Sequence, residues 1–313
     1  MKRLSLIFSL IWSFFYAQDF SPLGKNNEIV KHSYYTLSYS EEDEQAEWIY
    51  YELNSNQLNS AVSRSNNFKS DPLISTSSAQ LYDYKGSGYD RGHLAPAGDM
   101  KYNSNAMSES FYMSNMSPQS SSFNRGIWKK IEKQFRDWSL KYGELVIITG
   151  PILNEDKLGT IGSNKVTVPR QFYKVAIDPK NLDRNVAILI ENRGSSESIK
   201  SFAVSIDELE RVSGLDFFYK LSEETQLRIE SRANTEMWDW SVTYISKPRP
   251  YPVIDGNIDY HKDHLPSKGE IFKTKTGAKY HKGNCRYLAK SKIPISNSEA
   301  QNSGLTPCGV CKP

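Results

Sequence analysis

A histidine that follows two charged residues and a glycine is the first feature of this chain that could perform chemistry. His93 ends an Asp-Arg-Gly-His run, and roughly thirty residues later a segment contains Asn124, Glu132 and Arg136. Cleavage of a phosphodiester needs a base, a held cation and positive charge beside the phosphate. Histidine can supply the base, amide and carboxylate oxygens suit Mg²⁺, and arginine suits phosphate. These residue types therefore predict metal-assisted hydrolysis of a phosphodiester.

The elements around these residues are expected to hold them near one another. A Lys-Gly-Ser-Gly turn at residues 85–88 precedes the histidine run and places that run at a strand end or hairpin. Between residues 124 and 142, apolar side chains recur at intervals of three and four, which indicates an amphipathic helix. Glu132 and Arg136 are four residues apart, so they share a face beside the apolar stripe. Asn124 stands at the start of this helix.

Each of these residues also has a purely structural explanation. A single histidine is more often a satisfied core or surface group than a functional one. Asn124 could be only a helix N-cap, because asparagine is favoured there. Glu132 and Arg136 could be a surface ion pair that contributes a few tenths of a kcal/mol. The functional hypothesis depends on these residues meeting in one place.

Later apolar runs predict the centre of the fold. Residues 145–150, 172–177 and 185–190 have the composition of core strands, and a further helix is expected over residues 205–221. Strands and helices do not alternate regularly along the chain. We therefore predict an α+β fold with a central antiparallel sheet flanked by helices.

The N-terminal residues are typical of an export signal. Residues 1–17 have a positive start and then an apolar run of about 14 residues, which is too short to span a bilayer comfortably. We expect a signal peptide at 1–17 and an exported protein, secreted or periplasmic, with no membrane attachment after cleavage; an uncleaved anchor is the alternative. The rest of the chain is expected to contain a catalytic domain at 18–225, an extension and linker at 226–268, and a small module at 269–313.

The small C-terminal module contains every cysteine of the chain. His281 and Cys285 form one pair, Cys308 and Cys311 form another, and about twenty residues separate the two pairs. Three thiolates and one imidazole complete a tetrahedral Zn²⁺ site, and a metal would help so short a segment to fold. A disulfide with one spare thiol is the alternative. Residues 265–313 also hold nine Lys and Arg against two Asp and Glu, which suggests a basic tether for nucleic acid.

Several motifs in a fixed order give the chain a family resemblance. The Asp-Arg-Gly-His-x-x-Pro run at 90–96, the Ser-Asn-x-x-Pro-Gln run at 114–119 and the Asn-x3-Trp-x3-Glu-x3-Arg pattern at 124–136 are the main ones. Together with weaker matches, they resemble the DNA/RNA non-specific endonucleases, which are ββα-metal or His-Me finger nucleases, from about residue 29 to residue 221. The C-terminal module is similar to the Ada-type metal domain.

The resemblance implies a chemical role for each motif residue. His93 would be the general base that activates water, and Asn124 would be the direct protein ligand of Mg²⁺ or Mn²⁺. Glu132 would hold water molecules of that metal. Asn115 would orient His93 or nearby water. A ββα-metal finger would carry His93 and Asn124 beside the central sheet.

The arginines and the local charge indicate the substrate. Arg136 would contact the scissile phosphate, Arg91 flanks the base, and Arg64 lies where the family has a further phosphate-binding arginine. Residues 101–141 hold seven Lys and Arg against three Asp and Glu, and phosphate contacts carry affinity without sequence readout. The resemblance implies an endonuclease for DNA and RNA that leaves 5′-phosphate ends. A catalytically silent nucleic-acid-binding protein and a phosphodiesterase for small diesters are the alternatives.

Overall fold

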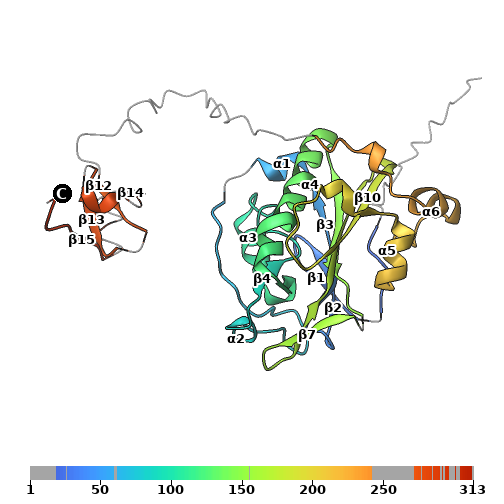
Figure 1. The fold of residues 1–313 in the computed structure, drawn as a ribbon, viewed down its shortest axis with the longest axis horizontal. Coiled ribbons are helices and arrows are strands. Elements are labelled where there is room, and N and C mark those ends of the chain that lie inside the picture. Colours follow the sequence, from blue (N-terminus) through green and yellow to red (C-terminus); the bar gives the residue numbers. More distant parts are fainter. Residues whose placement is uncertain are drawn as a thin grey trace, which may run out of the picture. The chain divides into compact units, whose positions relative to one another are not determined.

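The chain forms two compact units, which divide after Ile245 (Figure 1). The computed structural model describes residues 19–25, 27–59, 62–154 and 156–241 of the larger unit. In the smaller unit it describes residues 271–275, 277–283, 285–289, 291, 293–295, 300 and 304–311. The expected signal peptide at 1–17 and residues 242–268 of the expected linker lie outside the described residues. The expected domain boundary at residue 225 falls inside helix α6 (Glu223–Glu230) of the larger unit.

A seven-stranded antiparallel sheet forms the centre of the larger unit, and its strand order is β1-β2-β3-β6-β9-β10-β11. The strands are β1 (Glu28–Lys31), β2 (Thr36–Ser40), β3 (Gln45–Leu53), β6 (Leu145–Pro151), β9 (Gln171–Asp178), β10 (Asn181–Glu191) and β11 (Ala203–Val204). The three apolar runs of the sequence are β6, β9 and β10, which are neighbours in the sheet. Their residues are buried on both faces, so their sequences are nearly continuously apolar.

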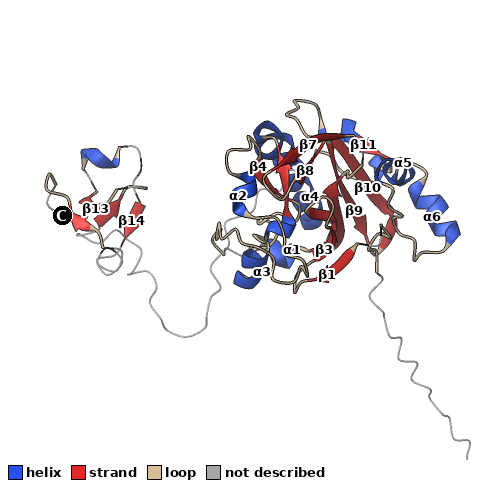
Figure 2. Cartoon of the chain, turned by 90° about the horizontal axis from the view of Figure 1, so that it is seen from below, coloured by secondary structure: helices blue, strands red, loops and turns tan. Residues whose placement is uncertain are grey.

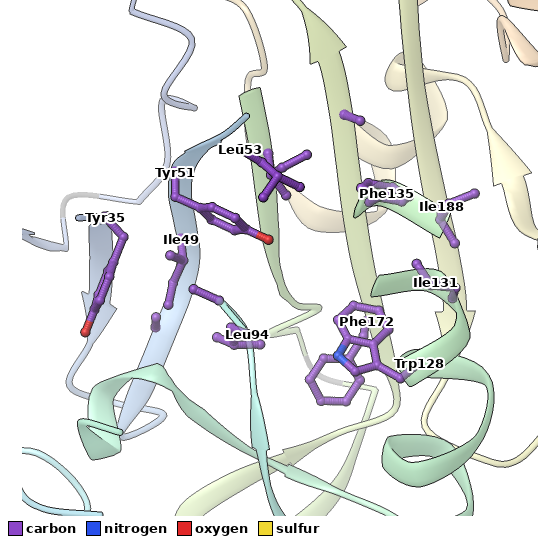
Figure 3. Packing of buried hydrophobic residues seen from close by; sticks show 14 of the residues in the cluster. Tyr35, Ile49, Tyr51, Leu53, Leu94, Trp128, Ile131, Phe135, Phe172 and Ile188 are labelled. Atoms are coloured by element: carbon purple, nitrogen blue, oxygen red, sulfur yellow. The ribbon is translucent and has the colours of Figure 1, made fainter. Parts of the chain in front are cut away.

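Helices cover both faces of this sheet (Figures 1 and 2). Helix α4 (Lys129–Tyr142) packs on one face, and α5 (Ile206–Ser213) and α6 pack on the other. Figure 3 shows Ile131 and Phe135 of α4 against the sheet, with Trp128 beside Phe172 of β9. Burial of each such side chain contributes about 1.5–3 kcal/mol. The predicted α+β architecture is confirmed.

The segment between β3 and β6 supplies the remaining helices and a hairpin. It contains α1 (Ser55–Leu58), α2 (Leu81–Tyr84), α3 (Ser104–Glu109) and the antiparallel pair β4 (Asp90–His93) and β5 (Met116–Gln119). A π-helical turn, η2 (Phe123–Trp128), leads from β5 into α4 and completes a β–β–α arrangement. A second hairpin, β7 (Lys157–Ile161) and β8 (Val166–Pro169), follows β6. Short 3₁₀ turns are η1 (Met113–Asn115), η3 (Ile199–Phe202) and η4 (Thr235–Met237).

The smaller unit contains a four-stranded sheet of order β14-β12-β13-β15. Its elements are β12 (Ile271–Lys273), β13 (Lys279–Lys282), η5 (Arg286–Leu288), β14 (Ile293–Ile295) and β15 (Thr306–Pro307). Leu288 packs with the thiols of Cys285 and Cys308 in a small buried cluster. Across the described parts of both units, no helix combines the length and apolar character needed to cross a bilayer.

Candidate active site

One pocket of about 830 Å³ beside the β4–β5 hairpin brings most of the predicted residues together. They come from an irregular segment, from β4, from η2 and from α4, and so from distant parts of the sequence. The predicted residues that line the pocket are Arg64, Arg91, His93, Asn124, Glu132 and Arg136. Asn115 does not line it.

His93 lies at the end of β4 and is buried, with the residue only 7% exposed. Its ring lies 4.8 Å from the ring of Phe111 and 5.9 Å from that of Phe68, measured between centroids. Burial, and then the positive charges of Arg64 and Arg91, lower the pKa of His93 to about 3. Its Nε2 has no hydrogen-bond partner within the described part of the chain. The imidazole is therefore neutral at pH 7 and able to accept a proton.

Asn115 and Gly92 fix the backbone on either side of His93. The buried Asn115 side chain donates to the carbonyl of Ala95 at 2.9 Å and accepts from the amide of Ala95 at 2.8 Å. A Cβ at Gly92 would lie 2.1 Å from the Gln119 side chain, which would have to move to make room for it. Asn115 thus holds the segment that follows His93, and it does not contact the imidazole itself.

Asn124 lies in the π-helical turn, a feature that is frequent at functional sites. Its amide nitrogen donates to Asp90 at 2.9 Å. Arg125 donates twice to the same carboxylate, at 2.8 and 2.6 Å, and Ser121 donates at 3.0 Å. Because the amide nitrogen of Asn124 is hydrogen-bonded to Asp90, the amide oxygen remains available to bind a metal ion. Asn124 caps no helix, since Ser122 and Trp128 occupy the cap positions of η2 and α4.

Glu132 and Arg136 do not form the surface ion pair that their spacing allowed. Arg136 instead donates to the buried Asp99 at 2.7 Å, and Asp99 also accepts from the hydroxyl of Tyr51 at 2.7 Å. The Glu132 carboxylate has no hydrogen bond or ion pair to any residue that the structure describes. Burial raises the pKa of Glu132 to about 7 although the charges of Arg136 and Lys174 oppose the shift. The Glu132 carboxylate is thus a possible metal ligand in the pocket, with no protein partner among the described residues.

The two other arginines lie over aromatic rings. The guanidinium of Arg64 is 4.8 Å from the ring centroid of Phe111, and that of Arg91 is 4.4 Å from the ring centroid of Phe68. Stacking on a ring positions a guanidinium while its N–H groups stay available for an anion. The pocket therefore has positive charge on several sides.

Two charged residues beside the pocket have no role in the sequence-based prediction. One is Asp99, which holds Arg136. Lys174 is buried in the middle of β9, donates to the carbonyl of Leu94 at 3.3 Å and lies 5.1 Å from the ring of Trp128. Burial lowers the pKa of Lys174 to about 8, with Glu132 and Asp99 opposing the shift. The sequence did contain a sign of Lys174, because it is a lysine within an apolar strand and a buried charge needs a partner.

The C-terminal residues meet in the smaller unit. The ligand atoms of His281, Cys285, Cys308 and Cys311 all lie within 4.8 Å of one another, and the three thiols are free. His281 Nδ1 is 3.3 Å from Cys285 Sγ and 3.9 Å from Cys311 Sγ. Backbone hydrogen bonds from Cys311 and Val310 lower the pKa of the Cys308 thiol to about 6. This arrangement could hold a tetrahedral metal ion.

Known nucleases resemble this chain over most of the larger unit. Nuclease C1 of Cunninghamella echinulata var. echinulata is 34% identical over 225 residues, which cover 66% of this chain and 89% of that protein. A nuclease of Nostoc sp. is 31% identical over 227 residues, which cover 68% of this chain and 81% of that protein. The mitochondrial Nuclease EXOG of Mus musculus is 32% identical over 225 residues, with 66% of this chain and 61% of that relative covered.

These relatives correct the expected location. Nuclease EXOG is named mitochondrial, and so is Nuclease 1 of Schizosaccharomyces pombe, which is 39% identical over 156 residues covering 44% of this chain and 48% of that protein. Their location contradicts the secreted or periplasmic one expected from residues 1–17. A charged start and a short apolar run alone were insufficient to predict where the protein resides.

A solved structure and a family comparison agree with these relatives. The crystal structure of the EndoG/EndoGI complex, which concerns EndoG inhibition, matches with a TM-score of 0.59 and 32% identity. The match covers 65% of this chain and 90% of the matched one. The family described as DNA/RNA non-specific endonuclease matches residues 16–224. This chain belongs to the DNA/RNA non-specific endonuclease family.

Proposed function

We propose that the protein is a Mg²⁺-dependent endonuclease, with Mn²⁺ as an alternative metal, that hydrolyses DNA and RNA without sequence specificity and leaves 5′-phosphate ends. The observation that carries this proposal is the neutral imidazole of His93 in one pocket with the amide of Asn124 and the predicted arginines Arg64, Arg91 and Arg136. A protein that only bound nucleic acid would have no use for a buried, uncharged base beside its phosphate-binding groups.

The pocket residues fit a hard divalent cation. Asn124 has an amide oxygen that its hydrogen bond to Asp90 leaves free, and Glu132 has a carboxylate without a protein hydrogen bond among the described residues. Oxygen donors of these two kinds, supplemented by water, are what Mg²⁺ prefers. When bound, Mg²⁺ would polarise the phosphate and stabilise negative charge on the leaving oxygen.

The remaining groups account for hydrolysis. His93 accepts a proton from water while the water oxygen bonds to phosphorus, and the bond from phosphorus to the 3′ oxygen breaks. The 3′ oxygen leaves as a hydroxyl after taking a proton from solvent water, and the phosphate stays on the 5′ oxygen of the downstream nucleotide. Arg64, Arg91 and Arg136 offset the negative charge that builds up on the phosphate oxygens. Such contacts are made to the phosphates of the nucleic acid and not to its bases, which suits cleavage without sequence specificity.

Digestion of plasmid DNA and of RNA, with and without EDTA, tests the proposal. His93→Ala should lower the rate by about 10²–10⁴-fold, the usual contribution of a general base. Arg211→Ala is the matched control, because Arg211 is exposed and pairs with Glu208 away from the pocket. Binding without cutting by the unaltered protein would favour the silent nucleic-acid-binding protein. Cleavage of bis(p-nitrophenyl) phosphate but not of polymers would favour the small-diester phosphodiesterase.

We also propose that His281, Cys285, Cys308 and Cys311 hold one structural Zn²⁺, because four protein ligands leave no open position. Metal analysis of the full chain should find one zinc per molecule, and Cys308→Ser should lose it while plasmid cutting persists. A disulfide detected in the zinc-free native protein would contradict the site. Deletion of residues 265–313 should weaken DNA binding at low salt if this basic segment is a tether, and unchanged affinity would exclude that role.

A further inference from the structure

Three carboxylates gather between α5 and α6, on the sheet face opposite to α4. The ligand oxygens of Asp207, Glu210 and Glu230 all lie within 4.8 Å of one another. Asp207 is exposed, Glu210 is partly buried, and Glu230 is only 6% exposed. Two oxygens on opposite sides of a calcium ion, each about 2.4 Å from it, would be about 4.8 Å apart. The three side chains are thus close enough to share one ion.

The Glu230 carboxylate is the unexplained group in this cluster. Its Oε1 is buried and has no hydrogen-bond partner in the described part of the chain. Glu210 accepts one hydrogen bond, at 2.7 Å from the amide of Phe217. A buried carboxylate is costly to keep without a donor or a positive charge. In the part of the chain that the structure describes, neither Glu210 nor Glu230 pairs with a lysine or an arginine.

Basic residues of the same region do not supply that charge. Each of them has a partner elsewhere: Arg211 pairs with Glu208, Arg228 with Asp183, and Arg232 donates to Asn234. Burial and the neighbouring acids, including Asp216, instead raise the pKa of Glu210 to about 7 and that of Glu230 to about 8.

We propose that Asp207, Glu210 and Glu230 form a Ca²⁺ site that joins α5 to α6 and is separate from the active site. Calcium takes six to eight oxygen ligands in a flexible geometry, so water can complete its shell on the exposed side of Asp207. Magnesium demands a stricter octahedron, usually keeps several waters and is commonly held by one or two carboxylates. A site with three carboxylates and one open side thus suits calcium better.

Calcium titration of the full chain in an Asn124→Ala background tests this site, because that change removes the direct protein ligand proposed for the active-site metal. Calorimetry should find one bound Ca²⁺. The melting temperature should rise by about 5–10 °C at roughly one hundred times the dissociation constant. Adding Glu230→Gln should abolish both effects, whereas adding Glu208→Gln, on the same helix α5 but outside the cluster, should preserve both.

Each outcome decides the proposal. Absence of Ca²⁺ binding in the Asn124→Ala protein overturns it, and so does binding that survives Glu230→Gln. If Glu230→Gln prevents folding, the exposed Asp207→Asn change decides instead, with affinity expected to weaken at least about tenfold. A melting temperature that responds to pH but not to calcium would show that the carboxylates only share protons. The same titration with Mg²⁺ should show weaker binding, and an equal affinity would refute the choice of calcium.

Discussion

Replacing Asp99 by asparagine tests how Arg136 is held toward the phosphate. The Asp99 carboxylate is 2% exposed and accepts from both Arg136 and Tyr51 at 2.7 Å. Asparagine has nearly the same size, but it carries no charge and has one acceptor oxygen in place of two. One of the two donors therefore loses its acceptor, and the guanidinium loses its counter-charge.

The size of the effect follows from burial. A hydrogen bond to a charged group contributes about 1.5–3 kcal/mol, and breaking a fully buried ion pair costs about 3–5 kcal/mol. Because the Arg136 side chain is 22% exposed, water recovers part of this loss, and we expect the free energy of unfolding to fall by about 2–3 kcal/mol. A mispositioned Arg136 should also lower kcat/KM by about 10- to 100-fold, which corresponds to about 1.4–2.7 kcal/mol of transition-state stabilisation.

Urea unfolding and the rate of cleavage of a fluorogenic oligonucleotide measure the two effects separately. Tyr51→Phe removes one hydrogen bond but keeps the charge of Asp99, so it should cost about 1.5–3 kcal/mol of stability and leave the rate within about threefold. Asp137→Asn is a further control, because Asp137 pairs with Lys133 on α4 away from the pocket. A folded Asp99→Asn protein with an unchanged kcat/KM would refute the positioning role. Equal rate losses in Tyr51→Phe and Asp99→Asn would refute it as well.

Two further predictions concern buried charges. Lys174→Met should increase the Mg²⁺ concentration needed for half-maximal cutting at pH 7, because Lys174 lowers the pKa of Glu132 and its removal favours the protonated carboxyl; an unchanged magnesium requirement would contradict this coupling. The pKa of Glu230 is about 8 in the folded protein, against an ordinary value of 4.5. Its contribution to stability is therefore fully present below pH 4.5, where the carboxyl is protonated, and is lost as the pH rises through 8. In calcium-free buffer the melting temperature should therefore fall between pH 5 and pH 8.5, and a fall of equal size in Glu230→Gln would show that other groups cause it.

Local sequence patterns predicted the helices and strands in which buried side chains recur at a regular spacing. The apolar spacing over residues 124–142 predicted α4, because Trp128, Ile131 and Phe135 are all buried against the sheet. The same spacing continues into η2, so it gave no sign of the π-helical turn there or of the break in backbone angles at Gly126. Periodicity reports which side chains face the core, and it does not report how the backbone hydrogen bonds are arranged.

The partners of the site residues could not be predicted in this way. Asp99 and Arg136 are 37 residues apart, and Asp90 and Asn124 are 34 apart. Only the packing of β4, and of the turn after it that contains Asp99, against η2 and α4 brings each pair together. Family motifs indicated Asn124 and Arg136. They included Asp90 without indicating that it holds Asn124, and they did not include Asp99. Lys174 could have been found, since an apolar strand that contains a lysine must provide a place for its charge.

The arginines of the pocket influence the protonation state of His93. Arginines that suit phosphate surround His93, and their positive field is one cause of its low pKa, after burial. The same groups that concentrate an anionic substrate thus keep the imidazole uncharged at pH 7. An acidic residue in contact with His93 would reverse this effect, because it would favour the imidazolium and compete with the phosphate. The carboxylates of Asp99 and Asp90 instead accept hydrogen bonds from Arg136 and Asn124. They orient the guanidinium that would bind phosphate and the amide of Asn124, and they do not favour the protonated form of His93.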